Sequence, residues 1–90
     1  MDILEQIRTR LNALSPLQCE LIDDSHRHAG HAGARQGGGH YQLRIVSAAF
    51  ASHPRLARHR MIYAALGDLM HTRIHALSIQ AETPDEAGQA

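Results

Sequence analysis

The feature that most constrains this chain is a stretch of sixteen residues, 25–40, that contains no aliphatic side chain larger than alanine. It holds four of the eight histidines and five of the seven glycines. Loops longer than about 12–15 residues are uncommon in compact domains and are usually functional or disordered. The core must therefore come from the segments on either side. The stretch itself is a metal-ligand set, an interaction surface or a solvated connection.

The segment before this loop predicts a helix and then a strand. Apolar residues recur at three- and four-residue spacing over 2–14, which indicates a helix with one apolar stripe. Asp2 can cap its start, and Ser15-Pro16 ends it, because the residue before a proline is disfavoured in the helical region. Residues 17–24 predict a strand, in which the single cysteine, Cys19, is expected to be a packing group. With one cysteine, no intramolecular disulfide can form.

The segment after the loop predicts a strand, a helix and a strand. Alternation over 41–45 indicates a strand that pairs with 17–24 as a hairpin. A helix is expected from about 56 to 71, preceded by a short turn at 54–58, because an unbroken helix from Arg55 would direct Arg58 and His59 into its apolar arc. Residues 74–81 predict a third strand.

This order of elements predicts an α+β fold with helices on one face of a mixed three-stranded sheet. The second and third strands are joined through a helix, so they are expected to be parallel. We expect one domain over residues 1–84 and a flexible acidic tail over 85–90. No signal peptide or membrane-spanning run is visible, which favours the cytoplasm.

The charges are unevenly placed although they sum to zero. Residues 41–81 carry five arginines and one acid, Asp68. Arg55, Arg58 and Arg60, with His59 between them, could meet phosphates or a protein partner, or could form a solvated face. No phosphate-binding loop, nucleophile elbow or paired catalytic carboxylates are present, so the sequence does not predict an enzyme.

The histidines are the remaining candidates for chemistry. The spacing of His26, His28 and His31 could hold a metal ion, although a glycine-rich loop would have to become ordered to do so. His75 is different, because it begins an apolar strand and is predicted to share a face with Leu77 and Ile79. Taken alone, it indicates a histidine at the edge of the core.

Several short segments together resemble the BolA family. The resemblance covers about residues 3–84 and is carried by motifs in family order and at family-like spacing: Asp24-Ser25, His28-Ala29-Gly30-His31, His40-Tyr41, Arg58-His59-Arg60-Met61-Ile62-Tyr63 and Ile74-His75-Ala76-Leu77-Ser78-Ile79. The last two segments are the most specific. The chain departs from the family pattern at 51–54 and in the extra glycines of the loop.

The resemblance implies a fold like the class II KH domain and a role without catalysis. Family members pair with monothiol CGFS-type glutaredoxins, and the pair can share a 2Fe–2S cluster with glutathione. His75 matches the ligand from the third strand, and the loop ligand would be His31 or His40. No cofactor is expected in the isolated protein, which would be a monomer, and no membrane or small-molecule substrate is expected. Imidazole ligands in place of thiolates raise the cluster potential and make the site sensitive to protonation.

Two other functions remain open. Members of the family have been proposed as transcriptional regulators, and the region Arg55–Arg60 could then contact DNA. The loop lacks the GXXG clamp of RNA-binding KH domains in its proper context, and the basic cluster is small. The weaker alternative is that the histidine loop binds zinc or copper without a partner.

Overall fold

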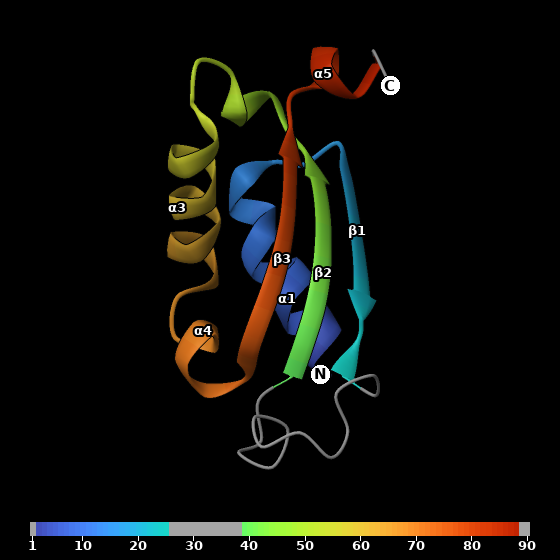
Figure 1. Ribbon diagram of the computed structural model, residues 1–90, viewed down its shortest axis with the longest axis vertical. Coiled ribbons are helices and arrows are strands. Elements are labelled where there is room, and N and C mark those ends of the chain that lie inside the picture. Colours follow the sequence, from blue (N-terminus) through green and yellow to red (C-terminus); the bar gives the residue numbers. More distant parts are fainter. Residues whose placement is uncertain (1, 26–38, 89–90) are drawn as a thin grey trace.

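The computed structural model describes residues 2–25 and 39–88. Its strands are β1 (Gln18–Asp23), β2 (Gly39–Val46) and β3 (Ile74–Glu82). Its α-helices are α1 (Ile3–Leu11), α3 (Arg55–Leu66), α4 (Leu69–Thr72) and α5 (Pro84–Gly88), and two 3₁₀ turns, η1 (Asn12–Leu14) and η3 (Ala48–Phe50), follow α1 and β2. Figure 1 shows the three strands as one sheet, with α1 behind it and α3 along one side.

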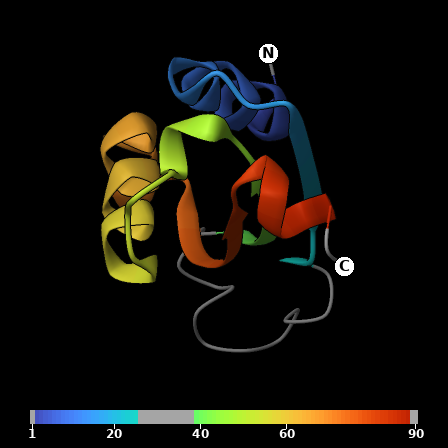
Figure 2. The same ribbon diagram turned by 90° about the horizontal axis from the view of Figure 1, so that it is seen from above.

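The sheet has the topology that the sequence predicts. The strand order is β1-β2-β3, in which β2 pairs antiparallel with β1 and parallel with β3. The expected α+β class is therefore confirmed. Figure 2, seen from above, shows α1 and α3 packed on the same side of the sheet. The opposite face of the sheet carries no helix in the part of the chain that the structure describes.

The core lies between this sheet and the two long helices. It is aliphatic apart from one phenylalanine and one tyrosine, and its fully enclosed members come from the helices, β2 and η3: Ile7, Leu11, Ile45, Phe50, Ile62 and Leu66. Alternation along β2 sends Tyr41, Leu43 and Ile45 inward and leaves Gln42 exposed. Cys19 packs against this core, as expected, and burial raises the pKa of its thiol.

Helix α1 begins and ends where local chemistry predicts. The Asp2 carboxylate accepts a hydrogen bond from the backbone N–H of Glu5 at 2.9 Å, which satisfies one of the unpaired donors of the first turn. The helix tightens into η1 and stops at Ser15, whose φ of 49° lies in the left-handed region, directly before Pro16. The predicted helix over 2–14 is thus α1 followed by η1.

The predicted start of the second long helix was wrong. No turn separates 54–58 from α3, which runs unbroken from Arg55. Arg58 does face inward, as an unbroken helix requires, but its charge is satisfied there by groups described below. The helix also ends earlier than expected, at Gly67, whose φ of 55° suits a residue without a side chain, and α4 follows as a separate turn.

Two further observations complete the fold. Pro84–Gly88 form α5 beyond the end of β3, so that residues 85–88 of the predicted flexible tail are helical. Within residues 2–25 and 39–88, no helix combines the length and the apolar character that crossing a bilayer requires.

Candidate functional site

Two histidines meet where β2 and β3 begin. The ring centroids of His40 and His75 are 5.0 Å apart, and the rings are tilted by 46°. The two residues lie 35 positions apart in the sequence and come together because β2 and β3 are parallel neighbours that start at the same end of the sheet. In Figure 1 this is the lower end, beside α4. We refer to His40 and His75 together as the histidine pair.

A bulge in β3 explains why these side chains meet. Gly39 pairs with Ile74 and the next residue, His40, pairs with Ala76. β3 therefore has one extra residue, His75, between two residues whose partners are adjacent in β2. Such a bulge changes the side to which the following side chains point. Ile74 is consequently buried (5% exposed) and Leu77, three positions later, also packs on the core, whereas His75 and Ala76 are exposed.

This corrects the predicted face of His75. Strict alternation put His75 with Leu77 and Ile79 and put Ile74 on the opposite face. The bulge reverses that assignment: Ile74 belongs to the core and His75 is exposed beside His40. The sequence carries no local signal of this bulge, since Gly39, at which the register shifts, lies on the other strand.

The backbone of His40 is held on both sides. Its N–H donates to the Ser25 hydroxyl oxygen at 3.0 Å, and its carbonyl accepts from the N–H of Asp24 at 2.8 Å. One residue earlier, the N–H of Gly39 donates to the carbonyl of Arg73 at 3.0 Å. The histidine pair is therefore attached to regular sheet structure.

The loop histidines lie outside the described residues. His31, the other predicted loop ligand, and its neighbours His26 and His28 all fall within 26–38. Among residues 2–25 and 39–88, no three His, Cys, Asp or Glu side chains are grouped as a metal site. The histidine pair is thus a group of two imidazoles.

The other predicted surface, on α3, divides into two kinds of residue. Arg58 is only 13% exposed, and its guanidinium donates to the carbonyls of His53 and Ala81 at 2.7 and 3.0 Å. It also binds both carboxylate oxygens of Glu86, at 2.6 and 3.1 Å, and lies 5.9 Å from the centroid of the Phe50 ring. Arg58 therefore joins α3 to the end of β3 and to α5, and does not belong to an exposed binding surface.

The electrostatics of this contact follow from its geometry. Hydrogen bonds from Arg58, with a backbone hydrogen bond from Thr83, lower the pKa of Glu86 to about 2. The same hydrogen bonds, which Arg58 donates to the carboxylate, raise the pKa of Arg58 further above its already high value. Both groups are consequently ionised at any physiological pH.

The remaining α3 residues do face outward. Arg55 and Arg60 are exposed and His59 is half-buried. Leu56 and Tyr63, which the sequence did not single out, are 62% and 43% exposed. Leu56, Arg60 and Tyr63 follow the i, i+4, i+7 spacing of one helix face, and this spacing is the signal that could have identified them.

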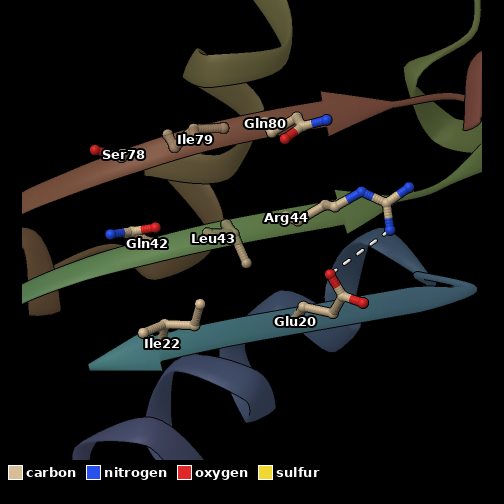
Figure 3. Close-up of a pocket in the computed structure, with 8 residues that line it drawn as sticks. All are labelled: Glu20, Ile22, Gln42, Leu43, Arg44, Ser78, Ile79 and Gln80. Carbon is tan, nitrogen blue, oxygen red and sulfur yellow. Dashed lines mark ion pairs between the residues drawn. The ribbon is translucent and has the colours of Figure 1, made fainter. Parts of the chain in front are cut away.

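The open face of the sheet forms a shallow hollow of about 380 Å³ (Figure 3). Its side chains come from all three strands and are largely polar: Glu20, Ile22, Gln42, Leu43, Arg44, Ser78, Ile79 and Gln80. Arg44, one of these residues, is paired with Glu82 at 3.1 Å and Glu20 at 3.6 Å. The charges of this hollow are matched within the chain, so we assign it a structural role.

Comparison with known proteins places the chain in a family. A family model described as "BolA-like protein" matches residues 11–86. The chain belongs to the BolA-like family. It is 37% identical to the "DNA-binding transcriptional regulator BolA" of Escherichia coli (strain K12), over 96% of this chain and 80% of that protein. It is 42% identical to the "BolA-like protein 1" of Homo sapiens, over 87% of this chain and 56% of that protein.

A BolA-like unit of this kind also occurs within a longer protein. The chain is 45% identical to "SufE-like protein 1, chloroplastic/mitochondrial" of Arabidopsis thaliana, over 90% of this chain but only 24% of that protein. The solved BolA domain of SufE1 from the same plant superimposes with a TM-score of 0.81 at 42% identity, covering 96% of this chain and 98% of that one. The chain thus spans about a quarter of one relative and just over half of another.

Proposed function

We propose that this BolA-like protein is an adaptor without catalytic activity that binds a monothiol CGFS-type glutaredoxin and co-ligates a shared 2Fe–2S cluster. It would act in iron–sulfur trafficking or in iron- and redox-linked regulation. The observation that carries the proposal is the histidine pair, whose ring centroids lie 5.0 Å apart where β2 and β3 begin. The proposed role requires no acid–base or nucleophilic chemistry from the side chains of the described residues.

The donor set suits such a cluster. Imidazole is a good ligand for iron, and in Rieske-type centres two histidines replace two cysteines on one iron. The histidine pair would supply two ligands, and the partner's cysteine and a glutathione thiolate would supply the others. The cluster would contribute electron transfer or would itself be the cargo. The chain's own task is to hold two neutral imidazoles in place, so acid that protonates them would weaken binding.

His40 is the better supported of the two loop candidates. Its backbone is hydrogen-bonded on both sides and its ring already lies beside His75. A ligand held in place before binding avoids much of the entropy cost of ordering a loop. His31 stays the alternative, and separate alanine variants of His31 and His40 distinguish the two.

The exposed face of α3 would contribute to docking of the partner. Arg55 and Arg60 offer positive charge, and Leu56 and Tyr63 offer apolar contact area beside them. Arginine and tyrosine are enriched among residues that dominate interface energies. Arg58 is excluded from this role by its contacts inside the fold.

A titration tests the proposal. This protein is added to a monothiol glutaredoxin that carries a glutathione-ligated 2Fe–2S cluster, and visible absorption and circular dichroism are followed. We expect a spectral change that saturates at one equivalent in the wild type and is absent in His75→Ala. His71→Ala, an exposed histidine on α4, is the matched control and should behave as wild type. An unchanged spectrum on adding wild-type protein would contradict the proposal.

The second candidate is DNA binding, which the name of the Escherichia coli relative favours. Arg55 and Arg60 are the exposed cations of α3 that could contact phosphates. If they do, duplex affinity should fall steeply with salt, and each arginine-to-alanine change should reduce the slope of log K against log salt by about 1. Arg8→Ala on α1 is the matched exposed control. Undetectable or salt-insensitive binding would remove this candidate.

A further inference from the structure

Gly39, the first residue of β2, occupies a position where no side chain fits. A Cβ atom built there would lie 2.5 Å from Cζ and 2.6 Å from Cε2 of the Tyr41 ring. Carbon atoms in favourable contact are about 3.5–4.0 Å apart, so any larger residue must displace the ring or the strand. Gly88, by contrast, has open space around it.

The position of the Tyr41 ring explains this close approach. Residues two apart on a strand project to the same face, so the ring of Tyr41 can lie back along β2 over Gly39. Tyr41 is 6% exposed, and the side chain of Ser25 lies within reach of its phenol. The ring thus reaches from β2 toward Ser25, the second residue after the end of β1.

Ser25 connects this contact to the histidine pair. Its hydroxyl oxygen accepts a hydrogen bond from the backbone N–H of His40 at 3.0 Å, and the same side chain lies within reach of the Tyr41 phenol. Its own N–H donates to the Asp23 carboxylate at 2.9 Å, which fixes the serine at the end of β1. One side chain therefore ties His40 and Tyr41 to the neighbouring strand. We call the hydrogen bond from His40 to the Ser25 side chain, together with the contact of that side chain with the Tyr41 phenol, the Ser25 bridge.

We propose that the Ser25 bridge, made possible by the absence of a side chain at Gly39, is the device that positions the His40 ring beside His75. Its importance for a cluster rests on the function proposed above, but the positioning itself does not. Ser25, Gly39 and Tyr41 are positioning residues, because they act on a metal ligand through the backbone of β2.

The contact between the two rings can be measured in the protein without any metal. In the wild type, nuclear Overhauser effects between the ring protons of His40 and His75 should be observed. Ser25→Ala, which removes the bridging oxygen, should abolish them, whereas Ser25→Thr, which keeps a hydroxyl, should retain them. Gly39→Ala should also abolish them, and Gly88→Ala should not. Backbone amide spectra report whether each variant is folded. If Gly39→Ala does not fold, the two Ser25 variants provide the test.

Retention of the ring contact in folded Ser25→Ala would overturn the proposal, as would its absence in the wild type. A second measurement separates this proposal from the proposed function. The same variants are titrated with the cluster-loaded glutaredoxin and followed by visible circular dichroism. Loss of the ring contact with an unchanged cluster spectrum would support the bridge and remove His40 as a ligand. Loss of both would support the bridge together with the ligand assignment.

Discussion

The polar side chains at the two ends of the sheet differ in the partners that surround them. At the end where β3 finishes, Arg58 and Glu86 neutralise each other, and further hydrogen bonds to backbone carbonyls occupy the guanidinium. At the end where β2 and β3 begin, the rings of His40 and His75 lie side by side. The first arrangement stabilises the fold, and the second is the one that we propose contributes to a metal centre shared with a partner.

The comparison teaches that a residue's type does not decide its role. Arg58 and Arg60 are two positions apart on one helix, yet the first is largely buried and the second is exposed. The histidines behave similarly, since His71 and His75 are close in sequence and only His75 contacts another histidine ring in the described part of the chain. Partner groups and strand register decide these differences.

The largest expected effect comes from the histidine end. His75→Ala should abolish the shared cluster while changing the free energy of unfolding by less than about 0.5 kcal/mol, because His75 is exposed. Cluster absorption in the complex and chemical denaturation of the free protein measure the two quantities. A strongly destabilised variant would mean that the histidine end is structural, and the contrast between the ends would fail.

The opposite pattern is expected for Arg58→Met. Removal of the guanidinium leaves the carbonyls of His53 and Ala81 and the Glu86 carboxylate without their partner, which should cost about 1–3 kcal/mol of stability. Urea denaturation measures this loss. Arg60→Met is the matched control and should stay within about 0.5 kcal/mol. Loss of partner binding in Arg58→Met without loss of stability would contradict the structural role.

Acid should weaken the arginine end in a defined range of pH. Because the pKa of Glu86 is lowered from 4.5 to about 2 in the folded protein, its ionised form stabilises the fold above about pH 4.5. This contribution should disappear as the pH falls from 4.5 to 2. The stability difference between wild type and Glu86→Gln should therefore be constant at pH 5–7 and shrink in acid. Thermal denaturation across this range checks the trend, and a difference that grows in acid would exclude the ion pair.

The smallest effect is expected on the open sheet face. Glu20 lies 3.6 Å from Arg44 and is mostly exposed, and surface ion pairs of this kind contribute little. Glu20→Gln should change stability by less than about 0.5 kcal/mol and leave cluster transfer unaffected. An altered cluster spectrum in this variant would bring the sheet face into the partner interface and weaken the contrast between the two ends.

Most of the fold could be predicted from the sequence because periodicity and capping are local signals. The cap at Asp2, the stop at Ser15-Pro16 and the alternation of β2 all appear where the pattern indicates. The unbroken start of α3 could not be predicted, because it depends on groups that satisfy Arg58 from distant parts of the chain.

The candidate site was predictable in residue identity but not in geometry. His75 and His40 were singled out through a family resemblance, and the structure brings them together. Their contact depends on a bulge between two strands and on the hydrogen bond from His40 to Ser25. Neither of these interactions can be recognised in a single sequence. His31 lies outside the described residues, so its candidacy stays a prediction.

The most direct test of the central claim is pulsed electron paramagnetic resonance on the reduced complex. This protein would carry ¹⁵N-labelled histidine, and the glutaredoxin and glutathione would be unlabelled. We predict two strongly coupled ¹⁵N nuclei in the wild-type complex and a single one in the complex of His40→Ala. A complex without any ¹⁵N coupling would show that this chain supplies no histidine ligand and would contradict the account.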